Sequence, residues 1–335
     1  MSIQRAQLRI IHTGRLPGAV KSGKRGPEPD LIPGADGGTA CSCGILLMRY
    51  YLKAMRPHQW AKNLLVYLVV ITGHYFDPWT LIVTTAAFVC FCLAASSAYI
   101  LNDLIDIESD RAHPTKCRRP IAAGAIPARR AMAFSAVLMG LALGLATALP
   151  LAFAAVLAVY VAVTVGYSLV LKRIAILDVI TLGALYTIRV FAGLMVSGAK
   201  QSPWLFMFCL FLFTSLALVK RCSELVMRRD EGEAAVAGRD YTVSDLAVLF
   251  PAAIAAGFGA ILIVALYMSS PEVTALYRYP ARLWLLHPVL IYWISRTILL
   301  SSRNQLHDDP VVFALTDRVS WVVAGLAALI IGLAI

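Results

Sequence analysis

The chain contains a series of apolar runs, each about long enough to cross a lipid bilayer as a helix. About twenty apolar residues span the hydrocarbon core, and backbone inside a bilayer must satisfy its own hydrogen bonds. The sequence therefore predicts an all-α protein, an integral membrane bundle of about nine transmembrane helices. The nine runs lie near 60–76, 79–101, 131–149, 151–171, 175–197, 203–219, 246–268, 283–300 and 319–335.

The composition excludes most other classes of protein. Apolar residues make up 59% of the chain and charged residues 15%, whereas soluble domains have about 45–50% and about 25%. A soluble fold cannot bury so much apolar surface, and disordered or disulfide-rich classes do not fit either. The seven cysteines show no metal-type spacing, so we expect them to be structural or incidental. The net charge of +11 indicates attraction to lipid headgroups or a site for phosphates rather than nucleic acid.

Lysine and arginine divide unevenly between the segments that join the apolar runs. With the N-terminus inside, 25 of the 30 basic residues fall on inner segments and three on outer loops, while Arg189 and Arg296 lie within spans. Positive residues accumulate on the cytoplasmic side of membrane proteins. We therefore predict a protein of the cytoplasmic membrane whose inner loops face the cytoplasm.

The first residues differ from the rest of the chain. Residues 1–48 contain glycine, proline and charge without a long apolar region, so they do not form a secretory signal peptide. We predict a disordered cytoplasmic tail over 1–48 and a transmembrane domain over 49–335; a start codon assigned too far upstream is the alternative. Residues 46–53 predict an interfacial helix that leads into the first span.

A group of carboxylates follows the second apolar run. Asp103 comes directly after Asn102 and is followed by Asp106 and Asp110, and at about 100° per residue the three carboxylates share a narrow arc of one helix face. Carboxylates this close repel one another unless a cation lies between them. Ligand sets made only of oxygen suit Mg²⁺, which keeps substrate phosphates among its ligands. The sequence therefore predicts a Mg²⁺ site here; a solvated acidic helix end is the alternative.

Basic residues follow these carboxylates and recur in the other inner segments. Because these cations follow the carboxylates so closely in sequence, they are candidates to bind the oxygens of a diphosphate. The alternative is a cytoplasmic loop whose basic residues serve only to orient the protein in the membrane. The polar and charged candidates for substrate contact are Lys62, Arg111, Lys116, Arg118, Arg119, Tyr167, Lys172, Lys220, Arg221 and Glu224.

Other charged residues receive structural interpretations. The spacing of Lys220, Glu224 and Arg228 predicts ion pairs along one helix face. Asp178 and Arg189 share a face of the fifth span, where ionisable residues usually face a cavity or a partner. The residues 56–63 fit partly a membrane anchor and partly a site, whereas 307–310 predict helix termination and loop packing.

At these residues the sequence resembles the UbiA superfamily of intramembrane prenyltransferases over about 50–335. The resemblance rests on Asn102-Asp103-x-x-Asp106-x-x-x-Asp110-Arg111, followed by Arg119-Pro120. It implies a helical bundle around a central cavity, with a cytoplasmic polar cap that holds Mg²⁺ and a diphosphate and with a lateral opening for an isoprenoid chain.

The sequence departs from this pattern after the sixth run. Typical aromatic prenyltransferases of the family carry a second acidic cluster there, whereas this chain has Lys220-Arg221-x-x-Glu224. This resembles the polyprenyl-phosphate phosphoribosyltransferase sub-group, which uses phosphoribosyl diphosphate as donor and polyprenyl phosphate as acceptor. More phosphates must be held in that reaction, so cations should replace carboxylates. The residues 56–63, 113–116 and 317–318 are also similar to that sub-group.

We therefore predict a Mg²⁺-dependent transferase that moves 5-phosphoribose onto a polyprenyl phosphate. Asp103, Asp106 and Asp110 would hold the metal with help from Asn102, and Glu224 would bind a second metal or a sugar hydroxyl. The alternative is prenyl transfer from a polyprenyl diphosphate to an aromatic acceptor such as 4-hydroxybenzoate. A transporter is a distant alternative, because transporters place charge near the midplane. The expected partners are a polyprenyl lipid, a diphosphate-bearing donor and membrane lipids, but no nucleic acid; the oligomeric state stays open.

Overall fold

The computed structural model describes residues 40–112, 115–199, 202–233, 239–271, 273, 277–306 and 309–335. The chain divides into two compact units, residues 1–45 and residues 46–335, and the second unit contains the bundle. Most of the predicted tail over 1–48 lies outside the described residues, so its disorder stays a prediction. Helix α1 begins at Ala40 and continues to Met55, which includes the interfacial helix expected over 46–53.

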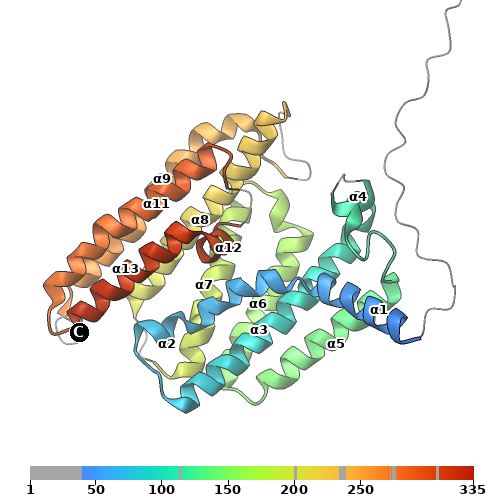
Figure 1. Ribbon diagram of the computed structural model, residues 1–335, viewed down its shortest axis with the longest axis horizontal. Coiled ribbons are helices and arrows are strands. Elements are labelled where there is room, and N and C mark those ends of the chain that lie inside the picture. The colour runs from blue at the N-terminus through green and yellow to red at the C-terminus, as the bar shows by residue number, and fades with distance from the viewer. Residues whose placement is uncertain are drawn as a thin grey trace, which may run out of the picture. The chain divides into compact units, whose positions relative to one another are not determined.

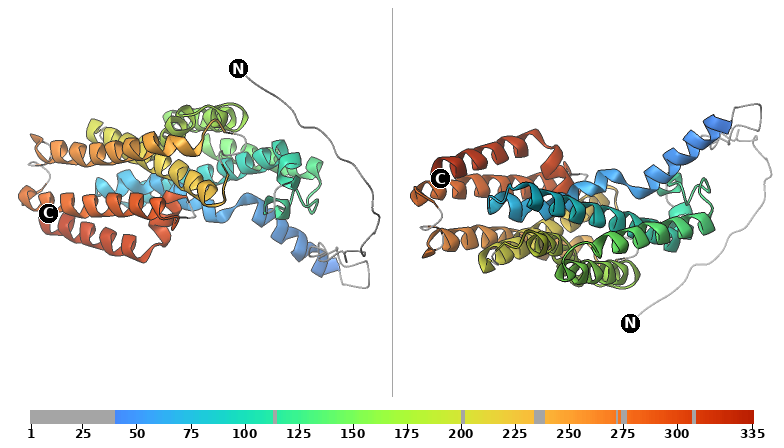
Figure 2. Two further views of the ribbon diagram at one scale, coloured as in Figure 1. Left: turned by 90° about the horizontal axis from the view of Figure 1, so that it is seen from above. Right: turned by 90° about the horizontal axis from the view of Figure 1, so that it is seen from below.

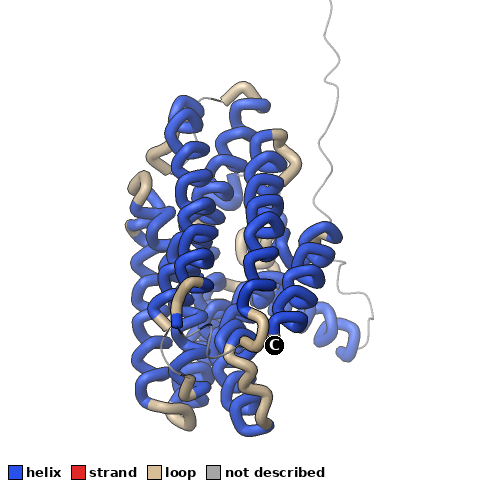
Figure 3. The backbone as a smooth tube through the Cα atoms, turned by 90° about the vertical axis from the view of Figure 1, so that its left-hand side faces the viewer, coloured by secondary structure: helices blue, strands red, loops and turns tan. Residues whose placement is uncertain are grey.

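All regular elements of the described segments are helices, as Figure 3 shows. Short 3-10 helices, labelled η, join several of the longer ones. The main elements are α1 (Ala40–Met55), η1 (Pro57–Tyr67), α2 (Leu68–Thr72), α3 (Pro78–Ile105), α4 (Ile107–Ala112), η2 (Lys116–Arg118), α5 (Ala128–Ala146), α6 (Leu151–Leu169), η3 (Leu171–Arg173), α7 (Leu177–Ser197), α8 (Pro203–Asp230), η4 (Val243–Asp245), α9 (Leu246–Met268), η5 (Pro280–Leu285), α11 (Leu286–Ser302), α12 (Pro310–Thr316) and α13 (Arg318–Ala334).

Seven of the predicted spans are confirmed as helices long and apolar enough to cross a membrane. An eighth consists of α12 and α13, which are bent by 78° at Asp317. The remaining run, 60–76, forms η1 and the five-residue α2 instead of one long helix. Within the described residues the chain thus has seven candidate spans, or eight when the bent pair counts as one. The polar residues Lys62 and Asn63 in an otherwise apolar run account for this difference, because both side chains are buried in the protein and not exposed to lipid.

Three helices occupy the centre of the 46–335 unit. About half or more of the most apolar stretch of α3, α7 and α8 is buried, against about a fifth for α5, α6 and α11. The peripheral helices therefore present apolar side chains to the surrounding lipid. Figures 1 and 2 show the long helices running roughly alongside one another, with the short α12 lying across the middle of the bundle.

Several helix junctions meet at one end of the bundle, here called the α4 end. Lys172 of η3 contacts Asp106 at the end of α3, and Arg239, which follows α8, contacts Asp178 at the start of α7. Asn304 after α11 donates to Asp230 at the end of α8, at 3.0 Å. Loops that are distant in sequence therefore combine their polar side chains at the α4 end.

Close packing between η1 and α7 positions the first polar residues of the site. A Cβ atom added at Gly193 would collide with the carbonyl oxygen of Val66, so only glycine allows this approach. Arg56 has a left-handed backbone conformation, with φ 53°, and it separates α1 from η1. The chain thereby turns at Arg56 and passes directly along α7.

The acidic run at the end of α3 is interrupted at Asp106. The helix ends there with φ −92° and ψ 12°, and α4 begins at the next residue. The backbone N–H of Asp106 still donates to Asn102 and that of Asp110 to Asp106, at 2.9 and 2.8 Å. Helical hydrogen bonding thus continues across the break, and Asp103 and Asp110 remain on a common side.

Candidate active site

A cavity of about 950 Å³ opens among α3, α6, α7, α8 and η1. Its lining combines tyrosine rings with basic and acidic side chains from all of these elements. Nine of the predicted site residues contribute to this lining, namely Lys62, Asn102, Asp106, Asp110, Lys116, Arg119, Tyr167, Lys172 and Lys220. Asp103 lies next to the lining and is buried, with 2% of its surface exposed.

Two of the predicted metal ligands share one cation. Nη1 of Arg119 lies 3.0 Å from Asp103 and 2.6 Å from Asp110. Asp103 also accepts a hydrogen bond of 2.6 Å from Nη2 of Arg56. Both carboxylates are almost fully buried, where an unpaired charge is costly. The two arginines therefore offset part of the cost of burying these carboxylates.

The third carboxylate faces the cavity. Asp106 accepts hydrogen bonds of 3.0 Å from Nζ of Lys172 and 3.0 Å from the amide of Asn102. Its side chain is 27% exposed, far more than that of Asp103 or Asp110. We call Asp103, Asp106 and Asp110, with the cations Arg56, Arg119 and Lys172 that contact them, the aspartate group.

The aspartate group has the donor chemistry that Mg²⁺ requires, although another cation lies among its carboxylates. Among the described residues no three His, Cys, Asp or Glu side chains converge closely enough to hold a metal. Instead a guanidinium nitrogen of Arg119 lies between Asp103 and Asp110, within hydrogen-bond distance of both. Carboxylate oxygens are ligands that Mg²⁺ prefers, so the chemistry of these side chains fits the ion. The metal ligation stays a prediction.

A second charged group is built around Asp309, which precedes α12. Nζ of Lys62 and Nζ of Lys220 each lie 2.8 Å from the same oxygen of this carboxylate. The hydroxyl of Tyr186 donates to it at 2.9 Å. We call Lys62, Tyr186, Arg189, Lys220 and Asp309 the Asp309 group.

The charges in this group alter one another's ionisation. Burial lowers the pKa of Lys62 to about 8, and the ammonium group of Lys220 contributes to the decrease. Burial alone would raise the pKa of Asp309, but Lys220 and Lys62 together hold it below its ordinary value. Asp309 is therefore a carboxylate at neutral pH, and Lys62 is a cation that loses its proton under mildly alkaline conditions.

Arg189 completes the Asp309 group from α7. It donates to the amide oxygen of Asn63 at 2.8 Å and to the hydroxyl of Tyr160 at 3.0 Å. Its guanidinium carbon lies 5.8 Å from the ring centroid of Tyr186, and Nζ of Lys62 lies 5.9 Å from the same centroid. The polar residues of η1 and of α7 thus meet around one tyrosine ring.

Arg221 and Glu224 occupy different positions from those that the sequence suggested. Arg221 is 1% exposed; it contacts Asp178 at 2.5 Å and also Glu224, and it donates to Tyr167 at 3.3 Å. Neither Arg221 nor Glu224 lines the cavity. Both belong to a buried ion-pair network beside it, which supports the lining residue Tyr167.

The predicted row of ion pairs along α8 is wrong. Lys220 pairs with Asp309, Glu224 with Arg221 and Arg239, and Arg228 with residues 231 and 233. The helical spacing was correct, but each side chain finds a nearer partner on another turn or another segment. Asp178 and Arg189, by contrast, were expected to face a cavity or a partner, and each has a partner on another element.

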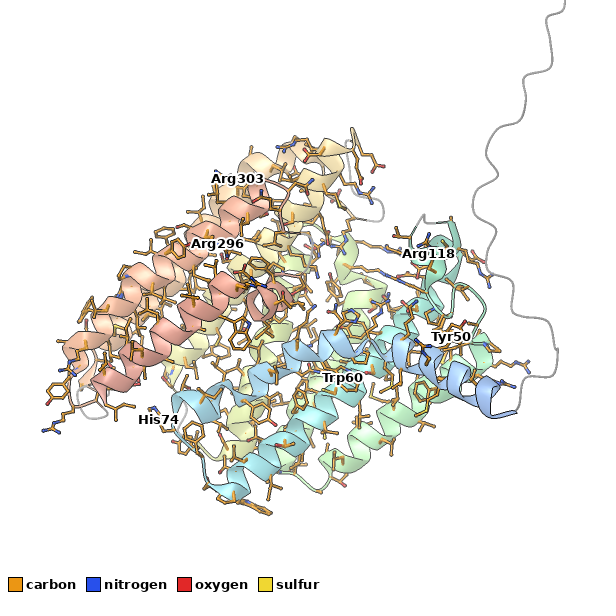
Figure 4. The ribbon with its side chains drawn as sticks, in the orientation of Figure 1. Tyr50, Trp60, His74, Arg118, Arg296 and Arg303 are labelled. Carbon is orange, nitrogen blue, oxygen red and sulfur yellow. The ribbon has the colours of Figure 1, made fainter. Side chains whose placement is uncertain are left out.

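Two basic residues after the carboxylates lie away from the cavity. Arg111 and Arg118 are exposed and are absent from its lining. Nε of Arg111 donates to the carbonyl oxygen of Ala122 at 3.1 Å, and Figure 4 shows Arg118 beside α4 at the edge of the bundle. Direct phosphate contact by these two residues stays a prediction without support from their placement.

Sequence reasoning missed part of the site. Tyr186 was not considered, and Asp309 was interpreted only as terminating a helix. The capping role is confirmed, because Asp309 accepts from the backbone N–H of Val311 at 3.2 Å. Asp309 also forms ion pairs with Lys62 and Lys220, which lie 247 and 89 positions away in the sequence. The adjoining 307 and 308, included in that prediction, lie outside the described residues.

The fold and the cavity define a membrane protein of several helical spans with a charged, tyrosine-lined cavity among its central helices. A profile of the UbiA prenyltransferase family matches residues 63–334. The chain belongs to the UbiA prenyltransferase family, and this membership supports the expected transferase over the transporter kept as a distant alternative.

Solved structures agree on the fold. A UbiA homolog from Archaeoglobus fulgidus bound to GPP and Mg²⁺ superposes with a TM-score of 0.63 at 18% identity, covering 84% of this chain and 99% of that chain. A structure described for digeranylgeranylglyceryl phosphate synthase gives a TM-score of 0.60 at 17% identity, over 86% and 98% of the two chains. At such identities the likeness concerns the fold alone.

Sequence relatives cover different shares of the chain. The uncharacterized protein y4nM of Sinorhizobium fredii is 41% identical over 83% of this chain, but the match spans 54% of that protein, about half of its length. The nodulation protein NoeC of Azorhizobium caulinodans is 31% identical over 83% of this chain and 91% of its own. The decaprenyl-phosphate phosphoribosyltransferase of Mycolicibacterium smegmatis is 39% identical over 54% of this chain and 58% of its own.

Proposed function

We propose that the protein transfers 5-phosphoribose from phosphoribosyl diphosphate to a polyprenyl phosphate, with diphosphate as the leaving group and Mg²⁺ as cofactor. The observation that carries this proposal is the charge of the cavity lining, which has nine basic residues and three acidic ones. The donor brings a diphosphate and a 5-phosphate, and the acceptor brings a further phosphate. The basic residues are Arg56, Lys62, Lys116, Arg119, Lys172, Arg173, Arg189, Lys220 and Arg239.

The two charged groups suit the two parts of this reaction. With Asp103, Asp106, Asp110 and the amide of Asn102 as its ligands, Mg²⁺ would neutralise the departing diphosphate. Arg119 and Lys172, which contact the carboxylates in the free protein, would turn to the diphosphate oxygens. Lys116 also lines this part of the cavity.

The acceptor is ionised before it reacts, so the transfer needs no general base. An oxygen of the acceptor phosphate forms the new bond to C1 of the ribose. The bond between C1 and the diphosphate oxygen breaks, and its electron pair leaves with the diphosphate. Preorganised cations stabilise the charge that develops on the leaving group.

Partial relatives support this reaction. Decaprenyl-phosphate phosphoribosyltransferases from Corynebacterium glutamicum and Mycolicibacterium smegmatis share 35% and 39% identity with just over half of this chain. The matches that extend over 83% of the chain carry names that state no reaction. The reaction therefore rests on the cavity first and on these relatives second.

Prenyl transfer to an aromatic acceptor is the second candidate. Its support is the tyrosine lining formed by Tyr99, Tyr160 and Tyr186, because aromatic faces stabilise a prenyl cation. However, Arg56 already lies over Tyr99, 5.2 Å from the ring centroid, and Arg189 lies over Tyr160 at 4.8 Å. Guanidinium groups beside these rings disfavour a carbocation and favour an anion.

The orientation proposed for the site follows from the charge of the loops. We assign the α4 end to the cytoplasmic face of the cytoplasmic membrane, because the predicted inner loops after Lys62 carry 15 basic residues and the outer loops only three. A water-soluble donor would then reach the cavity directly from the cytoplasm.

A donor comparison tests the proposed reaction. Protein purified in detergent receives Mg²⁺ with either labelled phosphoribosyl diphosphate and a polyprenyl phosphate, or a polyprenyl diphosphate and labelled 4-hydroxybenzoate. We expect label to enter the lipid phase only in the first mixture and to stay aqueous when EDTA is present. Lipid-soluble label in the second mixture alone would replace the proposal by aromatic prenyl transfer.

A further inference from the structure

The two charged groups of the cavity differ in net charge. In the aspartate group three cations face three carboxylates. In the Asp309 group Lys62, Arg189 and Lys220 face the single carboxylate of Asp309. The first group is balanced without any ligand, whereas the second has an excess of two positive charges in the free protein.

The two groups also lie at different depths. Asp103 is two residues from the end of α3, at the α4 end. Tyr186 and Arg189 follow the start of α7 by nine and twelve residues, which at 1.5 Å per residue places them about 13 and about 18 Å along that helix. The Asp309 group therefore lies well inside the apolar part of the bundle.

An excess of positive charge at this depth requires an anion. Lys62, Arg189 and Asp309 are each less than 9% exposed, so water compensates their charges poorly, and buried charges without a partner are costly. A phosphate monoester carries about −1.5 to −2 charges at neutral pH, which matches the excess. Its oxygens would accept from both lysines, because the two ammonium groups already converge on one carboxylate oxygen.

We propose that the Asp309 group binds the phosphate carried by the lipid substrate, while the aspartate group takes the diphosphate of the water-soluble donor. Asp309 is then a positioning residue, which holds Lys62 and Lys220 together and thereby directs both onto one phosphate. This assignment rests on the proposed function for the identity of the two substrates. The depth of the group fits a phosphate attached to a chain that resides in the membrane.

Binding measured one substrate at a time tests the assignment. The probes are farnesyl phosphate, a short lipid phosphate, and phosphoribosyl diphosphate with Mg²⁺, each titrated against detergent-purified protein. We expect Lys220→Gln and Lys62→Gln to weaken farnesyl phosphate at least tenfold and to change the dissociation constant of the donor less than threefold. Lys172→Gln, the matched lysine of the aspartate group, should weaken the donor and spare farnesyl phosphate.

Further probes identify which part of the ligand is recognised. Farnesol tests the chain without the phosphate, and inorganic phosphate tests the anion without the chain. We expect inorganic phosphate to compete weakly with farnesyl phosphate in the wild type and not in Lys220→Gln. An equal loss of both substrates in the Lys220 and Lys172 variants would overturn the division of the cavity, as would a loss of the donor alone in Lys220→Gln.

Kinetics of Asp309 variants separate positioning from general damage to the fold. We expect Asp309→Asn to raise KM for polyprenyl phosphate at least tenfold with little change in KM for the donor, and Asp309→Glu to restore part of the loss. A fall in kcat alone, or an equal rise in both KM values, would contradict a positioning role. Elution in detergent and the thermal unfolding midpoint identify any variant that fails to fold.

The outcomes also distinguish this inference from the proposed function. If phosphoribosyl transfer is absent while farnesyl phosphate binding still depends on Lys62 and Lys220, the proposed reaction is wrong and the lipid phosphate site stands. If transfer occurs but neither lysine affects farnesyl phosphate binding, the reaction stands and the site assignment is wrong.

Discussion

At the scale of single residues, Arg119 takes the place between Asp103 and Asp110 that a divalent cation would need. In the proposed reaction this guanidinium and the metal ion would compete for the same two carboxylates, and the same guanidinium is a candidate contact for the diphosphate. The position would then link metal binding to donor binding, because Arg119 would leave the carboxylates on turning to a phosphate.

Replacing Arg119 should change metal and donor affinity in opposite directions. In Arg119→Gln the internal competitor is removed, so we expect the Mg²⁺ concentration for half-maximal activity to fall severalfold. The KM of the donor should rise about tenfold or more, because a charge-assisted contact worth about 1.5–3 kcal/mol is lost. Titrations of Mg²⁺ and of donor measure both quantities; a rise in both would show that Arg119 does not compete with the metal.

The ionisation of Lys62 predicts a pH dependence for the lipid substrate. Its pKa of about 8 means that Lys62 is cationic below pH 8 and loses its charge as the pH rises through 8. We expect kcat/KM for polyprenyl phosphate to fall above that pH, since kcat/KM reports the free enzyme. In Lys62→Arg the guanidinium stays charged, so this fall should disappear; an unchanged profile in that variant would assign the titration to another group.

At the scale of elements, the contact between η1 and α7 determines where half of the Asp309 group lies. Eleven residues in 3-10 conformation are unusual, because such runs rarely exceed three or four residues. Gly193 allows the backbone of Val66 to approach α7, and this approach brings Lys62 and Asn63 to Arg189.

A side chain at position 193 should displace η1. We expect Gly193→Ala to lower the free energy of unfolding by about 1–3 kcal/mol, as overpacking does, and to weaken farnesyl phosphate binding as Lys62 moves. Gly140→Ala in α5 is the matched control, because a Cβ there meets nothing within 4 Å. Thermal unfolding in detergent compares the two; similar midpoints for both variants would mean that η1 accommodates the added atoms.

The elements that periodicity and hydropathy define could be predicted from the sequence. The long helices from α3 to α11 correspond to apolar runs, which can be identified from hydropathy without knowing what each helix packs against. The run at 60–76 was predicted as a span because its hydropathy does not reveal that Lys62 and Asn63 would be buried against α7. The arc of Asp103, Asp106 and Asp110 was predicted on one continuous helix, whereas α3 ends before Asp106, whose side chain accepts from Asn102 and Lys172.

The site could be predicted only where its residues are neighbours in sequence. Five of its lining residues, Asn102, Asp106, Asp110, Lys116 and Arg119, come from one run whose carboxylates and cations indicate metal and phosphate chemistry. Asp309 could not be identified as a site residue from the sequence. Its role depends on ion pairs with Lys62 and Lys220, which only the packing of the whole bundle brings to it. Arg221 was assigned to substrate because the sequence does not show that its side chain is already paired with Asp178 on another helix.

At the scale of the whole molecule, most loops that carry positive charge meet at the α4 end, while the lining extends inward to Arg189 and Tyr186. The two proposed substrates have opposite solubilities, and we expect each to approach such a cavity from its own phase. The orientation of the bundle in the membrane would then decide from which compartment the donor is drawn.

Cysteine labelling tests that orientation. Cys117 is half-buried in the segment after α4, whereas Cys90, Cys92, Cys209 and Cys222 are buried. With the two N-terminal cysteines at 41 and 43 replaced by serine, we expect a membrane-impermeant maleimide to label inverted vesicles and not right-side-out cells. A Cys117→Ser variant provides the background, and labelling of intact cells would place the α4 end outside.

The position of Asp309 in the chain has a consequence for biosynthesis. Lys62 is translated before Lys220, and Lys220 is translated 89 residues before Asp309, the carboxylate that both lysines contact. Until Asp309 has left the ribosome, the two lysines lie in or beside the membrane without their shared counter-ion. The Asp309 group is thus assembled in the order of translation, cations first, and a chain released before Asp309 would carry these cations into the bilayer unneutralised.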